Sequence, residues 1–166
     1  MLFRSASFPL YFFSTVCERK IDLGLLIDSS ESITEQPLEN LLQNFLPEFL
    51  RTQFTRGTIG RNGTRVGVVK FDHKTSILVD FNDKRSYMRN ELVEMLENTS
   101  SNVVFETRFD KALEEVSTSL FSAKGGERTD FPNVLVIFTD GKPFPRDEVK
   151  PFNVTLPPLR VSVMRI

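Results

Sequence analysis

The stretch LLIDSSES at residues 25–32 places an acid directly after a run of aliphatic residues and then alternates serines behind it. Residues 21–27, IDLGLLI, predict a strand that is buried on both faces, because a short apolar run between polar flanks is typical of such strands. Asp28, Ser30 and Ser32 follow the end of this strand. A turn, a helix cap and a metal site are the three structures that use this pattern.

Amphipathic helical patterns alternate with further apolar strands along the rest of the chain. Helices are predicted at about residues 38–50, 86–97 and 109–121, and strands at 66–71, 76–81, 134–138 and 159–166. Asp72 to Thr75 predicts a tight hairpin between two of these strands. Pro37 suits the N1 position of the first helix, whereas Pro47 predicts a kink or an early stop in it.

This order of elements predicts an α/β fold with a doubly wound, mostly parallel, Rossmann-like sheet. We expect helices on both faces and one antiparallel hairpin strand at an edge. Ligands of such sheets bind outside the carboxyl ends of the strands. The two most apolar strands both end in an acid, Asp28 and Asp140, so this edge is the predicted site.

Length and composition indicate one globular domain without an electrostatic reason to bind nucleic acid or an anionic membrane. The chain has 166 residues, 40% of them hydrophobic, and a net charge of −1. No apolar run approaches the roughly twenty residues of a membrane helix, so no transmembrane segment is predicted. With one histidine, His73, and one cysteine, Cys17, a His-rich zinc site and an internal disulfide are not expected.

The first seventeen residues predict a secretory signal peptide, because Arg4 precedes a short apolar stretch and small residues lie near its end. The domain itself is then expected at residues 18–166. Three sequons for N-glycosylation follow, at Asn62, Asn98 and Asn153. Leader and sequons together predict a secreted, extracellular glycoprotein.

Local structure accounts for each polar motif when it is taken alone. Ser32 and Glu35 have the spacing of a capping box, and Thr107 and Asp110 form a similar pair. Asp140-Gly141 is a common turn dipeptide.

Taken together, the same residues would converge on one rim of the sheet. The metal ligands predicted in this way are Asp28, Ser30, Ser32, Thr107 and Asp140. Their oxygen donors suit Mg²⁺ or Mn²⁺ and argue against zinc. Two carboxylates roughly neutralise a divalent ion, so the ion would accept one more anionic oxygen from outside. Such chemistry favours capture of an acidic side chain over hydrolysis, and no enzymatic activity is predicted.

At these motifs the chain resembles the von Willebrand factor type A domain, shared by integrin inserted domains, matrilins and several collagens. DSSES at 28–32 matches the D-x-S-x-S of its metal-ion-dependent adhesion site. Thr107 in ETRFDKAL resembles the threonine of T-x-T-G-x-A-L, and FTDGKP carries Asp140 at the family's T-D-G. The resemblance implies Mg²⁺-dependent adhesion to a protein ligand with an acidic side chain, for example a collagen-like matrix protein.

The sequence departs from the family pattern at three positions. Glu31 stands where glycine is common, Phe109 replaces the second threonine, and Asp110 replaces the glycine. Glu31 and Asp110 would add negative charge beside the metal, tightening the cation but repelling an acidic ligand. The resemblance also implies an edge strand and a final helix that this sequence lacks, and with them a cysteine partner for Cys17.

Three other interpretations remain open at this point. The chain would serve as an intracellular assembly module of a multiprotein complex if its N-terminus were retained and its sequons unmodified. A metal hydrolase would need a base or an activated nucleophile, and the sequence places no His or Lys base with the two acids. A truncated product that binds nothing is the third.

Overall fold

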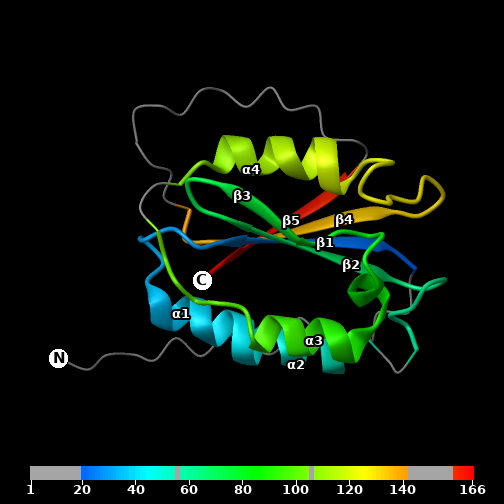
Figure 1. Ribbon diagram of the computed structural model, residues 1–166, viewed down its shortest axis with the longest axis horizontal. Coiled ribbons are helices and arrows are strands. Elements are labelled where there is room, and N and C mark those ends of the chain that lie inside the picture. The colour runs from blue at the N-terminus through cyan, green and yellow to red at the C-terminus, as the bar shows by residue number, and fades with distance from the viewer. Residues whose placement is uncertain (1–19, 55–56, 105–106, 142–158) are drawn as a thin grey trace.

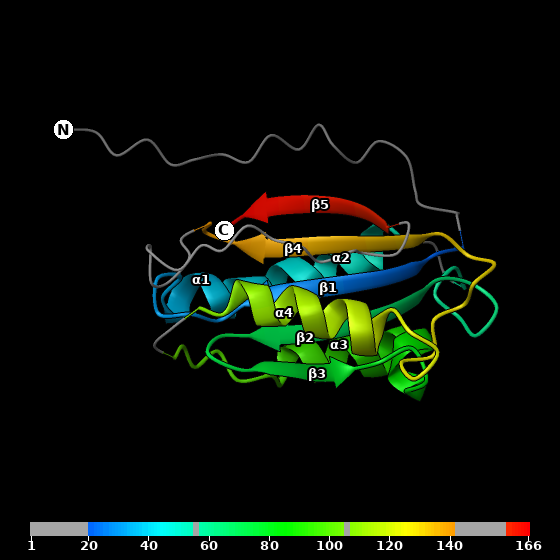
Figure 2. The ribbon, with the colours of Figure 1, turned by 90° about the horizontal axis from the view of Figure 1, so that it is seen from above.

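The computed structural model describes residues 20–54, 57–104, 107–141 and 159–166. Within them, five strands form one sheet in the order β3-β2-β1-β4-β5 (Figure 2). The strands are β1 (Asp22–Asp28), β2 (Arg65–Phe71), β3 (Thr75–Val79), β4 (Asn133–Thr139) and β5 (Leu159–Arg165). All neighbours pair in parallel except β2 and β3, which form the predicted hairpin at one edge. The mostly parallel sheet with an antiparallel edge strand is thereby confirmed.

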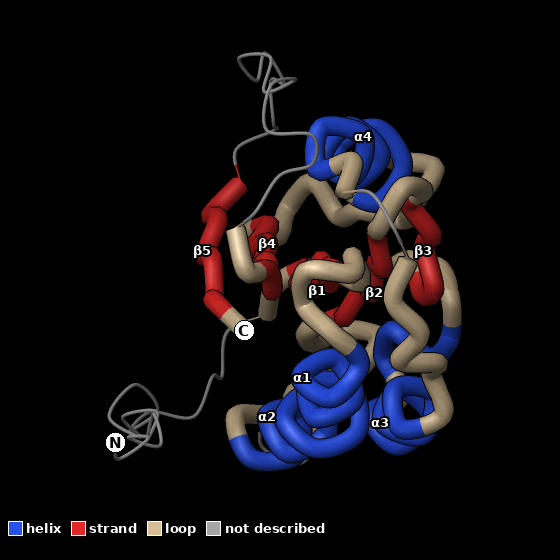
Figure 3. The backbone as a smooth tube through the Cα atoms, turned by 90° about the vertical axis from the view of Figure 1, so that its left-hand side faces the viewer, coloured by secondary structure: helices blue, strands red, loops and turns tan. Residues whose placement is uncertain are grey.

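Helices cover both faces of the sheet, as the sequence predicts. On one face lie α1 (Glu35–Asn40), α2 (Leu46–Thr52) and α3 (Arg89–Glu97), and on the other lies α4 (Phe109–Glu115), as Figures 1 and 3 show. The arrangement is doubly wound, because β2 and β3 lie on one side of the central strand β1 and β4 and β5 lie on the other.

The central strand β1 is buried along its whole length, which explains its aliphatic sequence. Leu25 and Ile27 belong to the core beneath α1, α2 and α3. Leu26 points the other way and belongs to the core beneath α4. Because both faces of β1 are dry, an acid at either of its ends is withdrawn from water as well.

Two glycines of the sheet let the residues that follow α4, Leu120 and Phe121, approach it closely. A methyl group on Gly67 would lie 2.7 Å from Leu120 Cδ1, and one on Gly24 would lie 3.0 Å from the Phe121 ring. The first distance is shorter than carbon atoms tolerate and the second is at the limit, so a side chain at either glycine would require Leu120 or Phe121 to shift.

The first helix continues past Pro47, so of the two predicted outcomes, a kink or an early stop, the early stop does not occur. A π-helical turn, Leu41–Phe45, joins α1 to α2 and keeps the chain helical from Glu35 to Thr52. A proline lacks the N–H of the helical ladder and its ring crowds the carbonyl four residues earlier. The wider π turn immediately before Pro47 is where such a mismatch is accommodated. Pro37 is the third residue of α1, and no intrahelical N–H bond is required there.

Asp22, at the start of β1, forms a buried ion pair with Arg128. Its two carboxylate oxygens accept bonds from the Arg128 backbone N–H at 2.8 Å and from Nε at 2.9 Å. Asp22 is fully buried, while the Arg128 side chain is 13% exposed and its guanidinium lies over the Phe131 ring. This pair ties the loop that precedes β4 to the first residue of the central strand.

Removing Asp22 should strongly destabilise the protein. In Asp22→Ala the Arg128 guanidinium would stay in a largely dry position without its carboxylate, which typically costs about 3–5 kcal/mol of unfolding free energy. Urea unfolding followed by circular dichroism would measure the loss. Glu114→Ala is the matched control, because its pair with Lys111 is exposed on both sides and should change stability by less than about 0.5 kcal/mol. Equal effects of the two substitutions would contradict a structural role for the buried pair.

Candidate metal centre

The carboxyl ends of β1 and β4 bring the two predicted acids to the same edge of the sheet. These strands are neighbours in parallel register, with Ile27 opposite Phe138. Asp28 therefore stands beside Thr139, and Asp140 follows directly. The convergence predicted from the apolar runs is a property of this register.

Asp28 is the centre of a small polar network. It is fully buried, and its Oδ1 accepts a bond from the Ser30 backbone N–H at 3.0 Å. Its Oδ2 accepts a 2.6 Å bond from the Thr139 hydroxyl, which in turn accepts from the Gly141 N–H at 3.0 Å. The end of β1, the loop that carries Ser30 and Ser32 (the serine loop) and the turn after β4 are thus joined through one carboxylate.

Burial raises the pKa of the Asp28 carboxyl above its ordinary value. The bonds from Thr139 and Ser30 act in the opposite direction, and the nearby charge of Asp140 raises the pKa further. A buried carboxylate with a second acid nearby is an arrangement that a bound cation stabilises. The donor set therefore fits a divalent ion.

The loop after β1 places its two predicted serines side by side. The Oγ atoms of Ser30 and Ser32 lie 3.1 Å apart, with Ser30 buried and Ser32 exposed. The predicted capping box does not form: α1 begins at Glu35, its N-cap is Thr34, and no side chain caps it. Ser32 therefore does not serve as the cap, and its hydroxyl contacts that of Ser30.

Thr34 ends the same loop in a backbone conformation that residues other than glycine rarely adopt. Its φ is 67° and its ψ is 159°, a combination that a β-branched residue seldom shows. The turn is held by bonds from Ile33 N–H to Ser30 O and from Thr34 N–H to Glu31 O, and the Ile33 side chain is buried. The burial of Ile33 fixes the serine loop despite this local strain.

Thr107 lies on a segment that hydrogen-bonds the serine loop. Val104 and Ser30 form a parallel bridge, with bonds from Glu31 N–H to Val104 O and from Val104 N–H to Ser29 O. Thr107 itself is buried, 6% exposed, and the cap predicted at Thr107 and Asp110 does not form, because the N-cap of α4 is Arg108 and no side chain caps it. Within the described residues no hydrogen bond joins its hydroxyl to the other four predicted ligands.

Sequence reasoning missed the residues that hold these loops in place. The Lys70 ammonium donates to Ser100 O at 2.9 Å and to Asn102 O at 3.2 Å, and burial lowers its pKa. It thereby anchors the segment that leads to Thr107. No sequence pattern points to this role, because Lys70 looks like an ordinary strand residue.

Asp72 at the end of β2 is a third acid at this edge. It accepts a bond from the Ser29 hydroxyl at 3.3 Å, and its backbone carbonyl accepts from the Arg108 N–H at 2.9 Å. His73 Nδ1 lies 2.6 Å from its Oδ1. The signal for it was present, since Asp72 also follows an apolar strand directly, but the prediction used it only as a turn residue.

The extra negative charge expected from Asp110 is balanced by its neighbour. Arg108 donates to both carboxylate oxygens of Asp110, at 3.0 Å and 2.7 Å, and these bonds lower the pKa of Asp110. Glu31 remains as an exposed acid on the rim. In the described residues no group of three or more His, Cys, Asp or Glu side chains could hold a metal, so a centre here depends on hydroxyl donors.

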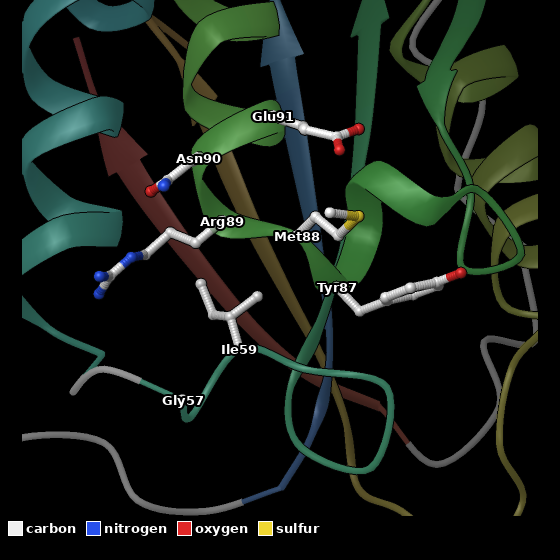
Figure 4. A pocket seen from close by; sticks show the side chains of 7 residues that line it. All are labelled: Gly57, Ile59, Tyr87, Met88, Arg89, Asn90 and Glu91. Atoms are coloured by element: carbon white, nitrogen blue, oxygen red, sulfur yellow. The ribbon is translucent and has the colours of Figure 1, made fainter.

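A hollow at the opposite end of the sheet offers no comparable chemistry (Figure 4). The loop before β2 and the start of α3 line it, through Gly57, Ile59, Tyr87, Met88, Arg89, Asn90 and Glu91. Its charged groups have protein partners: Arg89 donates to Phe54 O at 3.0 Å, and Glu91 lies 3.1 Å from Lys84 Nζ. None of the helices in the described ranges is long and apolar enough to cross a membrane.

The buried acid makes the stability of the metal-free fold depend on pH. Because the pKa of Asp28 is raised above its ordinary value of 3.8, the folded protein holds this proton more tightly than the unfolded protein. The contribution of protonated Asp28 to the unfolding free energy is therefore fully present below pH 3.8 and is lost as the pH rises through the raised pKa of the folded protein. In EDTA, the unfolding free energy of the wild type relative to Asp28→Asn should fall as the pH rises from 3.8 through that raised pKa. A difference that does not vary with pH in urea titrations would contradict it.

Comparison with known proteins identifies the fold and the family. The family model described as the von Willebrand factor type A domain matches residues 22–156. Mouse matrilin-3 is 31% identical over 133 residues, which cover 77% of this chain but only 26% of matrilin-3. The chain thus matches about a quarter of that relative's length.

Two solved structures share the fold at lower identity. Proximal thread matrix protein 1 from the mussel byssus, with a zinc-occupied MIDAS motif, superposes with a TM-score of 0.71 at 21% identity, covering 90% of this chain and 39% of that one. Manganese-loaded TRAP protein of Plasmodium vivax gives 0.68 at 19% identity, covering 91% and 59%. With its sheet order, its strand-end acids and the family match over most of its length, the chain belongs to the von Willebrand factor type A domain family.

Proposed function

We propose that this chain is a non-enzymatic binding module that takes a protein ligand through a divalent cation, Mg²⁺ or Mn²⁺. The buried Asp28 carboxylate carries the proposal, because it lies within reach of Asp140's charge and is bonded to the serine loop and to Thr139. Asp28, Ser30, Ser32, Thr107 and Asp140 would hold the ion directly or through water. The zinc-occupied MIDAS motif of the mussel protein and the manganese-loaded TRAP protein support a divalent cation at such a site.

The donor set suggests what the cation does. Two carboxylates offset its charge and three hydroxyls add none, so it keeps an affinity for a further anionic oxygen. An Asp or Glu side chain of a partner supplies that oxygen. The chain's own residues orient the ion: Thr139 and Ser30 fix the Asp28 carboxylate, and Lys70 positions the segment of Thr107. Outer hydrogen bonds of this kind tune metal affinity in other proteins.

The proposed setting is extracellular, with a collagen-like or other matrix protein as the partner. The named relatives support this setting, since matrilin-3 and a thread matrix protein share the domain. Residues 1–17, Cys17 and Asn153 lie outside the described residues, so the leader and the third sequon remain predictions. Asn62 and Asn98 are both exposed and accessible to glycosylation.

Removing Asp140 should abolish metal binding without unfolding the domain. Calorimetric titration of Mg²⁺ and Mn²⁺ into Asp140→Ala should show an affinity at least about a hundredfold weaker than in the wild type, because even outer partners of metal ligands contribute ten- to hundredfold. Asp130→Ala is the control, since Asp130 is an exposed acid before the other end of β4. Unchanged metal binding in Asp140→Ala, with folding confirmed by circular dichroism, would contradict the proposed role of Asp140 as a metal ligand.

Secretion can be tested through the two described sequons. Expression of the chain in a eukaryotic secretory system should yield protein in the medium that shifts to lower mass after treatment with an N-glycanase. Asn62→Gln and Asn98→Gln should each remove part of this shift. Retention inside the cell with an uncleaved N-terminus and no glycan would support the intracellular alternative instead.

A further inference from the structure

Arg165 lies beside the turn that carries Asp140. It is the last residue of β5 and pairs in register with Thr139 of β4. Its Nη2 atom is 3.6 Å from where a Cβ would stand on Gly141, which is an ordinary van der Waals distance. The Ile166 N–H bonds Thr139 O at 3.3 Å, so the backbone that carries this guanidinium is tied to the strand end.

The charge of Arg165 is available to a ligand. The side chain is exposed, and among the described residues it forms no hydrogen bond or ion pair. Arg108, which also lies at this edge, donates to both oxygens of Asp110 and is thereby neutralised. Among the described residues, Arg165 is therefore a guanidinium at this edge whose fork-shaped set of N–H donors still faces solvent.

In the part of the chain that the structure describes, Glu31 is an exposed acid on the other side of the centre. Glu31 lies between Ser30 and Ser32, and its N–H is bonded to Val104 O on the segment that leads to Thr107. Asp72, which follows β2, lies on the same side of the centre. Arg165 lies on the β5 side, beyond β4. Among the described residues, the centre is therefore flanked by a negative charge at Glu31 on one side and a positive charge at Arg165 on the other.

We propose that Arg165 makes this centre selective for a ligand segment with two acidic side chains, one for the cation and one for the guanidinium. The proposal rests on the proposed metal-dependent binding and adds to it the charge pattern of the partner. The second acid lies toward β5, because the opposite orientation would bring it against Glu31. A guanidinium binds a carboxylate through two parallel N–H bonds, which fixes direction as well as charge.

The test compares peptides with one and with two glutamates in an otherwise uncharged Gly/Ser sequence. In the two-glutamate series the second acid follows the first at increasing separations. Binding is followed by NMR titration of ¹⁵N-labelled protein with Mg²⁺ present and, in parallel, with EDTA. At the separation that reaches Arg165, the two-glutamate peptide should bind about two- to fivefold more tightly than the single one, the range typical of an exposed ion pair.

Arg165→Gln should reduce this gain to nothing, and Arg165→Glu should reverse it in favour of a peptide with one glutamate and one lysine. Arg160→Gln is the matched control, because Arg160 is an exposed arginine at the other end of the same strand. It removes the same charge and should leave the gain unchanged.

The outcomes separate this inference from the proposed function. If neither peptide binds in an Mg²⁺-dependent manner, the proposed function fails and the inference fails with it. If the single-glutamate peptide binds with Mg²⁺ but the second glutamate adds nothing, or adds the same in Arg165→Gln as in the wild type, only the inference is overturned. A loss of Mg²⁺ affinity without peptide in Arg165→Gln would also overturn it, because the effect would then be structural.

Discussion

The structure depends on a carboxylate that is buried at the end of a strand covered on both faces. Asp28 is fully withdrawn from water because β1 is central and its neighbours β2 and β4 extend beside it. An ionised acid in such a place is costly unless donors or cations compensate it. The serine loop, the turn after β4 and the hydroxyl of Thr139 are arranged around that requirement.

The two ends of β1 meet the same requirement in different ways. At its start, Asp22 is compensated by the chain's own Arg128, so this end is complete and serves stability. At its end, the described residues give Asp28 hydrogen bonds from neutral donors only, and the charge of Asp140 further disfavours the ionised form of Asp28. A buried acid with a built-in cation is a structural element, whereas one with neutral donors and a second acid nearby is suited to a cation from outside.

Beyond the centre, the sheet order distributes charge unevenly on the rim. β5 brings Arg165 to the side of Gly141, while the serine loop carries Glu31 toward the segment of Thr107. Asp110, which looked like an additional negative charge in the sequence, is held by Arg108. The family motif alone describes the cation's neighbours, but the surrounding pairs decide what else a ligand must carry.

By itself the sequence determined the strands, the helices and the order of the acids, because hydrophobic periodicity and strand-end residues are local signals. It also placed Asp28 and Asp140 at one edge, since parallel strands end together. The early stop at Pro47, one of its two alternatives, does not occur, because a π turn continues the helix. The caps at Ser32 and Thr107 were wrong, because the N-caps are Thr34 and Arg108 and neither helix start has a side-chain cap bond. Only the tertiary structure decided that Thr139 bonds Asp28 across 111 residues, that Lys70 anchors the Thr107 segment, and that Arg165 stands beside Gly141. These contacts follow from register between strands far apart in the chain, which no local pattern specifies.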